Sequence, residues 1–334
     1  MHVAIIHDHV TDADAPDAVD VLVQADVVEK ALAVLGHTSV HIGCTLDLEA
    51  VRRALTDSAA DMVFNLVESI EGKDRLLHLF PFLLDAMGMA YTGARAESML
   101  LTSNKVLAKK WMASCGIPTP SWTFGRNETT PDTREEETSR FDWIIKSVWE
   151  HASIGLDERS VVRGADTDQI EALISDRTPQ PGRTYYAERY IEGREFNLSV
   201  LAGPHGPEVL PPAEITFEGF TNDMPRIVDY NAKWNASSYE YEHTRRRFDF
   251  DPADRPLVDS LCSISLRCWR CFDMCGYCRI DFRVDTAGTP WVLEINANPC
   301  LSPDAGFVAA LSRANISYTE AVRRILNDTG NHLW

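Results

Sequence analysis

The chain has 334 residues, of which 45% are hydrophobic and 25% charged, and its 32 Lys and Arg against 50 Asp and Glu give a formal net charge of −18. This composition predicts a globular protein of two or three lobes rather than a disordered chain. The acidic excess argues against nucleic-acid binding, which needs a basic face. The sequence shows neither a signal-peptide pattern at its start nor an apolar run near the roughly 20 residues of a membrane span. We therefore expect a cytoplasmic protein without membrane or nucleic-acid partners.

Strands and helices alternate along the first hundred residues. Short apolar runs predict strands at residues 3–7, 38–43 and 61–67, and apolar positions at helical spacing predict helices at 21–35 and 46–55. This alternation favours a parallel sheet covered by helices on both faces. Residues 63–67 would then end at the carboxyl edge of the sheet, where ligands usually bind.

The remaining two thirds of the chain carry a different pattern. Residues 99–115 predict one helix, and a strand follows at 141–148. Residues 183–201 predict two strands separated by a turn at Glu192–Gly193. Residues 218–247 carry few regular signals and many polar and aromatic side chains, so we interpret them as a long functional loop. Residues 276–285 and 290–299 alternate around a turn at Ala287–Gly288 and predict a β-hairpin.

The hairpin carries the strongest chemical signal. Asp281 lies on its first strand, and Glu294 and Asn296 lie two residues apart on its second, so these oxygen-bearing side chains can share a face. Two carboxylates and an amide oxygen form the kind of hard-oxygen site that Mg²⁺ prefers beside phosphates. Arg279 projects from the same face and would stabilise a developing oxyanion or a phosphate. The alternative is a solvated strand face with paired surface charges.

A second signal lies after the strand at residues 141–148. Lys146 ends its apolar core, and a loop of small residues follows and ends in Gly155. A lysine beside exposed backbone N–H groups suits a polyphosphate. With one glycine and no GK[ST] sequence, this loop alone is a weaker signal than a P-loop.

Taken together, these segments resemble the ATP-grasp superfamily and, within it, the D-alanine–D-alanine ligase family. The resemblance extends from about Asp61 onward. It is carried in order by VFNLVES, YTGARAESMLLTSNKVLAKKWMASCGIPTP, IIKSVWEHASIGL, ERYIEGREFNLSVL, DYNAKW, GYCRIDFRVD and VLEINANPCLSP. It implies a three-lobed α+β ATP-grasp fold with an N-terminal Rossmann-like parallel sheet. We place the lobes at residues 1–100, 101–187 and 188–334, with ATP between the second and third.

The resemblance also implies a role for individual residues. Lys105 and Lys146 match the lysines that contact ATP, Ser153 a contact of the phosphate loop, and Lys233 the mobile-loop lysine that reaches the γ-phosphate. The family's residues that recognise adenine and ribose match Glu188, Arg189, Tyr190, Ile191 and Glu195. Asp281, Glu294 and Asn296 match the metal ligands, and Arg279 the arginine that stabilises the tetrahedral intermediate. The implied cofactors are ATP and two Mg²⁺ ions, for which Mn²⁺ can substitute, and the family makes a homodimer a possible assembly.

The reaction implied is a two-step activation of a carboxylate. Attack of a substrate carboxylate on the γ-phosphate gives an acylphosphate and ADP, and an amine then displaces phosphate to form an amide. Lysines and Mg²⁺ offset charge on the transferring group, so catalysis is mainly electrostatic and positional.

The substrate side departs from the family pattern. The glutamate that holds the first D-alanine's ammonium has no match in the aspartate-rich loop 7–20. Glu68 stands for the family's histidine, Ala152 for a serine, Trp234 for a tyrosine, and Cys300 and Ala305 for the glycine and serine of the second D-alanine site. The candidate substrate residues are Glu68, His151, Trp234, Cys300 and Asp304.

These departures predict a ligase for small amino acids or peptides other than two D-alanines. An amine-bearing or aromatic substrate would suit Trp234 and the nearby aspartates. The alternatives are a genuine D-amino-acid ligase and a non-catalytic ATP-binding regulatory module.

Two further features have ordinary explanations. Cys268, Cys271, Cys275 and Cys278 show a C-x2-C-x3-C-x2-C spacing, with Cys262 upstream, that resembles a zinc or iron–sulfur site. We instead expect all eight cysteines of the chain to be free thiols. Those of this group span a helix and a strand, which makes one metal site awkward, so we expect them to be buried. Glu68 and Ser69 have a helix cap as their structural alternative.

Overall fold

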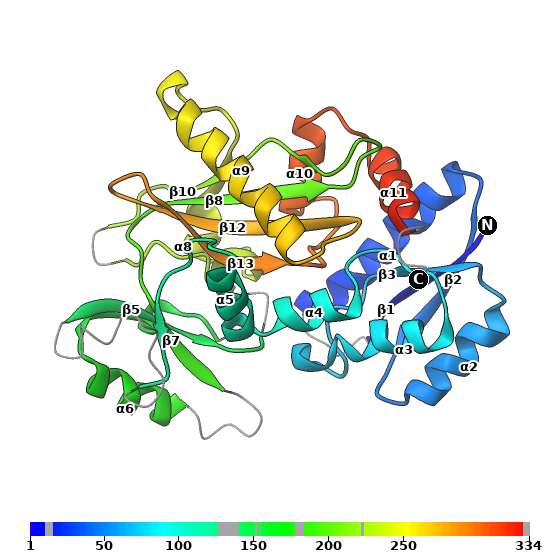
Figure 1. The fold of residues 1–334 in the computed structure, drawn as a ribbon, viewed down its shortest axis with the longest axis horizontal. Coiled ribbons are helices and arrows are strands. Elements are labelled where there is room, and N and C mark those ends of the chain that lie inside the picture. The colour runs from blue at the N-terminus through cyan, green and yellow to red at the C-terminus, as the bar shows by residue number, and fades with distance from the viewer. Residues whose placement is uncertain are drawn as a thin grey trace.

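The computed structural model describes residues 1–10, 16–125, 140–150, 153, 155–177, 184–221 and 224–329 (Figure 1). Its first part is a parallel sheet of strand order β2-β1-β3. The elements of this part are β1 (His2–Asp8), α1 (Pro16–Val34), β2 (Thr38–Cys44), α2 (Leu48–Ser58), β3 (Met62–Asn65), η1 (Asp74–Leu76) and α3 (Leu79–Met87).

Both faces of this parallel sheet are covered, as the alternation of strands and helices predicts. Val3 and Ile5 of β1 pack into one core with α1 and the C-terminal helices, while Ala4 and Ile6 face a second core with α2 and α3. The carboxyl ends of β1 and β3 therefore point toward the rest of the molecule, where Asp8 and the residues after Asn65 lie.

The second part joins the parallel sheet to an antiparallel sheet of order β4-β7-β5-β6. The single helix predicted at 99–115 is wrong: Asn104 interrupts it, because its side-chain oxygen accepts hydrogen bonds from the N–H groups of Val106 and Leu107. The elements are α4 (Ala96–Ser103), α5 (Lys105–Ser114), β4 (Trp122–Thr123), β5 (Phe141–Ser147), η3 (Glu158–Ser160), β6 (Val161–Ala165), α6 (Thr167–Arg177) and β7 (Tyr185–Arg189).

The third part is an antiparallel sheet of order β11-β10-β8-β12-β13, with β9 paired to β8. Residues 218–247 are more regular than predicted, since they contain two short helices and the edge strand β11. The elements are β8 (Gly193–Leu201), β9 (Glu208–Val209), β10 (Ala213–Phe217), α7 (Tyr230–Trp234), α8 (Tyr239–His243), β11 (Thr244–Arg247), η4 (Pro252–Asp254), α9 (Arg255–Cys271), β12 (Tyr277–Asp285), β13 (Pro290–Asn296), α10 (Gly306–Arg313) and α11 (Tyr318–Asn327).

Two hydrophobic cores connect these parts. One packs α4, α5 and α9 against β8, β12 and β13, and α9 crosses this sheet in Figure 1. The other joins β1, β3 and α1 to α10 and α11, so the C-terminal helices lie against the N-terminal part (Figure 1). One face of the hairpin β12–β13 thereby packs in the first core, and Tyr277 at its start joins the second.

The cysteines differ from the prediction in one respect. Cys115, at the end of α5, forms a disulfide with Cys271, the last residue of α9, and the other six cysteines are free thiols. The prediction that all eight are free thiols is therefore wrong for this pair.

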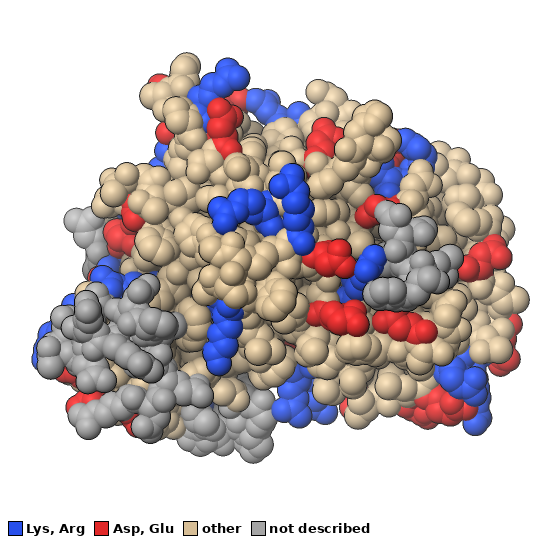
Figure 2. Space-filling model, in the orientation of Figure 1, with Lys and Arg blue, Asp and Glu red and all other residues tan. Residues whose placement is uncertain are grey.

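Charges of both signs are interspersed on the face of the molecule that Figure 2 shows, where Lys and Arg lie among Asp and Glu. Within the described residues, none of the helices combines the length and the apolar character that crossing a bilayer requires.

Candidate active site

The hairpin brings its predicted side chains together. Asp281 pairs with Glu294 and Arg279 with Asn296 across β12 and β13, so all four lie on adjoining positions. The guanidinium of Arg279 donates two hydrogen bonds of 2.8 Å to the two carboxylate oxygens of Asp281. The charge of Asp281 holds the pKa of Arg279 above its usual value despite burial, which on its own lowers that pKa. A pairing irregularity follows directly at Asp281/Phe282, and such bulges re-aim strand side chains.

The strand β8 supplies the other half of this face. Its register places Asn197 opposite Asp281 and Glu195 opposite Arg283. Asn197 Nδ2 donates to Asp281 Oδ1 at 2.8 Å, and Arg283 lies 3.0 Å from a carboxylate oxygen of Glu195. Both Glu195 and Arg283 are buried, and burial raises the pKa of Glu195.

Lys233, at the end of α7, lies near the hairpin residues Arg279, Asp281 and Glu294. Burial lowers the pKa of its ammonium group, Arg279 lowers it further, and Glu294 and Asp281 oppose the shift. These three charges therefore lie near enough to Lys233 to act on its pKa. A lysine, an arginine and two carboxylates thus converge over the hairpin.

The donor set suits a hard divalent cation. Asp281 and Glu294 offer carboxylate oxygens and Asn296 an amide oxygen. Oδ2 of Asp281 accepts one hydrogen bond, from Arg279, and so keeps a lone pair for a cation, whereas Oδ1 accepts two. Among the described residues, no group of three or more His, Cys, Asp or Glu side chains is placed to hold a metal ion. The cysteine spacing therefore forms no such site in the described part of the chain, and the candidate for Mg²⁺ is the mixed set of the hairpin.

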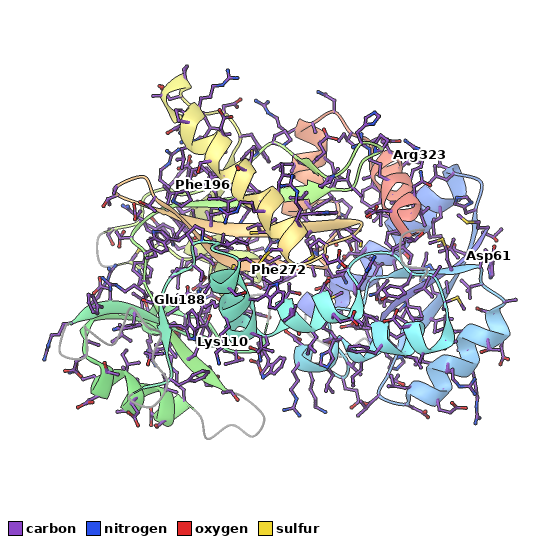
Figure 3. All side chains as sticks on the ribbon, in the orientation of Figure 1. Asp61, Lys110, Glu188, Phe196, Phe272 and Arg323 are labelled. Carbon is purple, nitrogen blue, oxygen red and sulfur yellow. A yellow bond between two sulfur atoms is a disulfide. The ribbon has the colours of Figure 1, made fainter. Side chains whose placement is uncertain are left out.

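A buried ion-pair network lies between α5 and the four-stranded sheet. Glu188 of β7 is 1% exposed, and its two carboxylate oxygens lie 2.7 Å from the ammonium groups of Lys109 and Lys146. Burial raises the pKa of Glu188, but the two lysines outweigh this and hold it below its usual value. In Figure 3, the labelled Glu188 and Lys110 mark β7 and α5, the elements that meet here.

Lys109 was not among the predicted site residues. It is fully buried, donates to Thr119 Oγ1 at 2.7 Å as well as to Glu188, and burial lowers its pKa to about 8. Its four-residue spacing from Lys105 on one helix face is the sequence signal that would have found it. Asn197 and Arg283 were also missed, although each lies two residues from a predicted residue on its own strand.

The other predicted ATP contacts lie around this network. Lys105 Nζ donates to the carbonyl of Glu150 at 2.5 Å, at the start of the predicted phosphate loop. Ser153 has a left-handed backbone with φ of 64°, and its hydroxyl donates to the carbonyl of Val228 at 2.7 Å. This bond ties the phosphate loop to the segment before α7, which carries Lys233.

Residues 190–192 form the short link between β7 and β8. The N–H groups of Arg189 and Tyr190 donate to the carbonyls of Ser121 and Asp142. The main chain of Ile191 has no hydrogen bond to another described residue. A purine could therefore be read by the backbone at Ile191.

The substrate side is a polar cluster between α1 and the segment after β13. Cys300 Sγ donates to Asp20 Oδ2 at 3.0 Å, and Gln24 Nε2 donates to Glu68 Oε1 at 2.9 Å. Ser302 Oγ donates to the other oxygen of Asp20 at 2.7 Å. Burial, with nearby carboxylates, raises the pKa of Glu68 to about 8. Asp20 and Gln24 were not predicted individually, because their partners lie far away in the sequence.

The remaining predicted substrate residues are placed as follows. Trp234 follows Lys233 at the end of α7, and the carbonyl of Asp304 accepts a hydrogen bond from Arg246 at 2.8 Å. His151 and Ala152 lie outside the described residues. The helix-cap alternative for Glu68 and Ser69 is wrong, since the following helices η1 and α3 have Lys73 and His78 as their N-caps. The N–H groups of Glu68 and Ser69 donate to the side chain of Asp8 instead.

Comparisons with known proteins agree with this architecture. The family model described as D-ala D-ala ligase C-terminus matches residues 111–327. The chain is 32% identical over 266 residues to the uncharacterized protein y4sG of Sinorhizobium fredii, covering 80% of this chain and 74% of that protein. It is 27% identical to a D-alanine–D-alanine ligase of a Synechococcus species, covering 92% of this chain and 88% of that enzyme.

The fold has solved counterparts as well. A crystal structure of D-alanine–D-alanine ligase from Bacillus anthracis complexed with ATP superposes with a TM-score of 0.73 at 19% identity, covering 99% of this chain and 98% of that one. The three-lobed α+β fold predicted from the motifs is thereby confirmed. From the family model and these relatives together, the chain belongs to the D-alanine–D-alanine ligase family of ATP-grasp ligases.

Proposed function

We propose that this protein is an ATP- and Mg²⁺-dependent carboxylate–amine ligase that forms an amide or peptide bond through an acylphosphate. The observation that supports this most is the convergence of Arg279, Asp281, Glu294 and Lys233 over one hairpin. Its substrates are small amino acids or peptides other than two D-alanines. The lobe boundaries, the cytoplasmic location and the homodimer named above stay predictions.

The nucleotide would lie between the antiparallel sheets. The backbone at Glu188–Ile191 would read adenine, Glu195 the ribose, and Lys105, Lys146 and Ser153 the phosphates. Lys109 and Lys146 hold Glu188 ionised, so the adenine end of the site carries a fixed, preorganised charge pattern.

The hairpin would serve the reacting end. Asp281, Glu294 and Asn296 would hold Mg²⁺, which when bound neutralises charge on the phosphate oxygens. Lys233 and Arg279 bring two positive charges to the place where negative charge develops. The bidentate bond to Asp281 keeps Arg279 in one orientation, so little reorganisation is needed when the tetrahedral intermediate forms.

The residues on the substrate side support a substrate other than two D-alanines. Glu68, Trp234 and Cys300 stand where the family has other residues, and Asp20 accepts hydrogen bonds from Cys300 and Ser302. Burial raises the pKa of Glu68 to about 8, so this carboxyl group would be able to carry a proton near neutral pH and to donate a hydrogen bond as well as accept one.

The test is release of ADP and phosphate from Mg²⁺-ATP against pools of L- and D-amino acids and small amines, with Glu294→Gln as control. We expect ADP release that depends on an amino acid and disappears in the variant. Release of AMP and pyrophosphate would refute the acylphosphate route. Efficient formation of D-alanyl-D-alanine would instead show a genuine D-alanine ligase.

A further inference from the structure

Arg283 of β12 is a buried arginine to which the proposed reaction gives no task. It is 3% exposed, although arginine is rarely buried unless its charge is paired. It lies two positions after Asp281, and the β8–β12 pairing runs without interruption through both, so the two side chains share one face of the sheet. That face carries the candidate site. The partners of Arg283 therefore indicate what it contributes there.

These partners come from three segments of the chain. Nη1 of Arg283 donates to the carbonyl of Gly193 at 3.0 Å, and Nη2 donates to the carbonyl of Arg226. Nη2 also lies 3.0 Å from Oε2 of Glu195. The donors of a guanidinium form a rigid planar fork, so acceptors in several directions hold the group in one orientation.

Two aromatic rings lie against the same guanidinium. Its central carbon is 5.7 Å from the ring centre of Tyr190, in the link between β7 and β8. It is 5.8 Å from the ring centre of Phe217, the last residue of β10. Both distances are within the roughly 6 Å over which a ring face attracts a cation. Packing thus adds to the hydrogen bonds that hold Arg283.

The carboxylate of Glu195 depends on this arginine. Glu195 is 8% exposed, and within the described part of the chain Arg283 is the one cation whose nitrogen lies within 4 Å of its oxygens. A buried carboxylate needs such a partner to compensate for lost hydration. An ionised carboxylate has about four lone-pair sites, so the contact with Arg283 leaves capacity for hydroxyl donors.

We propose that Arg283 is a positioning residue for nucleotide selectivity: it fixes the carboxylate of Glu195 so that the 2′ and 3′ hydroxyl groups of a ribose can both donate to it. This inference rests on the proposed ATP-dependent function, in which Glu195 binds the ribose. Arg283 acts through Glu195 rather than through a contact of its own with the sugar. A missing hydroxyl would leave part of a buried, fixed acceptor unpaired, and this is how such a site rejects a deoxynucleotide.

The test measures the affinities of Mg²⁺-ATP, Mg²⁺-2′-deoxyATP and Mg²⁺-3′-deoxyATP by calorimetric titration. Nucleotide binding is measured without an amino acid, so the result does not depend on which acid or amine the ligase takes. The proteins are the wild type, Arg283→Met, Arg283→Lys, Glu195→Gln and the double variant of Arg283→Met with Glu195→Gln. Circular dichroism establishes that each variant is folded.

Arg194→Met is the matched control. Arg194 directly precedes Glu195 on β8, so its side chain lies on the opposite face of the sheet. There it pairs with Glu214 at 2.8 Å and with Asp254 at 2.6 Å. The variant therefore removes an ion-paired arginine from the same sheet and leaves the contact between Arg283 and Glu195 in place.

We expect the wild type to bind ATP on the order of 10- to 100-fold more tightly than either deoxynucleotide. Glu195→Gln and Arg283→Met should each bring this ratio close to one, and the double variant should lower it no further, because the two residues act as a unit. Arg283→Lys keeps the charge without the fork and should retain part of the ratio. Arg194→Met should retain all of it.

A merely structural role of Arg283 would weaken the binding of all three nucleotides by the same factor and leave the ratio unchanged. A ratio that Glu195→Gln reduces but Arg283→Met does not would therefore overturn the inference and leave the ATP site intact. If Arg283→Met does not fold, an undiminished ratio in Arg283→Lys has the same meaning. A wild-type ratio of one would overturn the inference together with the ribose assignment of Glu195. A wild type that binds no ATP would overturn the ligase proposal itself.

Discussion

Lys109 and Glu188 show how a single buried contact supports the candidate site. Glu188 holds Lys146 with one oxygen and Lys109 with the other, and all three groups are largely shielded from water. A buried charge is tolerated only when its partners compensate for lost hydration. Lys109 therefore acts as a positioning residue for Glu188, and through it for Lys146.

Lys109→Met should destabilise the protein by roughly 3 kcal/mol or more, because it leaves buried Glu188 with one cation. It should also weaken ATP binding. Lys110→Met removes the same charge from the exposed neighbouring position and should change neither quantity by more than about 0.5 kcal/mol. Urea unfolding and calorimetric ATP titration measure both effects.

A second substitution separates packing from charge. Glu188→Gln in the Lys109→Met background removes the uncompensated carboxylate, so it should recover part of the lost stability. Equal stability of Lys109→Met and the wild type would contradict the role assigned to the network.

At the scale of elements, the connection between β7 and β8 determines how the residues of the candidate site are placed. These strands belong to different antiparallel sheets, and Gly193 begins β8 with φ of 147°. A Cβ at this position would lie 2.0 Å from the carbonyl oxygen of Val284 on β12. The glycine therefore permits the close approach of β8 to β12, which places Glu195 and Asn197 opposite Arg283 and Asp281.

Gly193→Ala should destabilise the fold by about 3 kcal/mol, since both the backbone conformation and the contact with Val284 resist a Cβ. Gly206→Ala is the matched control. Gly206 also has positive φ, 113°, but nothing lies within 4 Å of its added Cβ, so it should cost about 1 kcal/mol. Denaturant midpoints compare them, and equal losses would contradict the importance of the β8–β12 approach.

The elements also show what the sequence can and cannot predict. The hairpin was predictable because alternation in residues 276–299 fixes which side chains share a face. The break at Asn104 was not, because a capping residue inside an apolar pattern looks like a helix interior. The Cys115–Cys271 disulfide joins residues 156 apart, and spacing alone does not determine such a pairing.

At the scale of the whole molecule, the substrate side depends on contacts between distant parts of the chain. Asp20 of α1 holds Cys300 and Ser302, and Asn298 Nδ2 donates to the carbonyl of Val67. Composition and local pattern carry no information about such pairs, so the sequence predicted Glu68 and Cys300 but not the residues that hold them. The candidate residues of the hairpin lie on two adjoining strands, so their placement opposite one another could be predicted residue by residue.

The packing of these parts makes the candidate site a meeting point of all three sheets. Asp8 ends β1 of the parallel sheet and Glu68 follows β3, the four-stranded sheet carries Lys146 and Glu188, and the largest sheet carries the hairpin. One face of β12 packs in the core with α9, and Tyr277 at its start joins the core that α1, α10 and α11 share. A ligase that must align a nucleotide, a carboxylate and an amine benefits from such fixed relative placement.

The most direct test of the central claim follows an oxygen atom. An amino acid that supports ADP release is labelled with ¹⁸O in its carboxylate, and the phosphate released from Mg²⁺-ATP is analysed by mass spectrometry. Transfer through an acylphosphate predicts one ¹⁸O in each phosphate, with none formed by Glu294→Gln. Unlabelled phosphate together with ADP, or the appearance of AMP and pyrophosphate, would contradict the account.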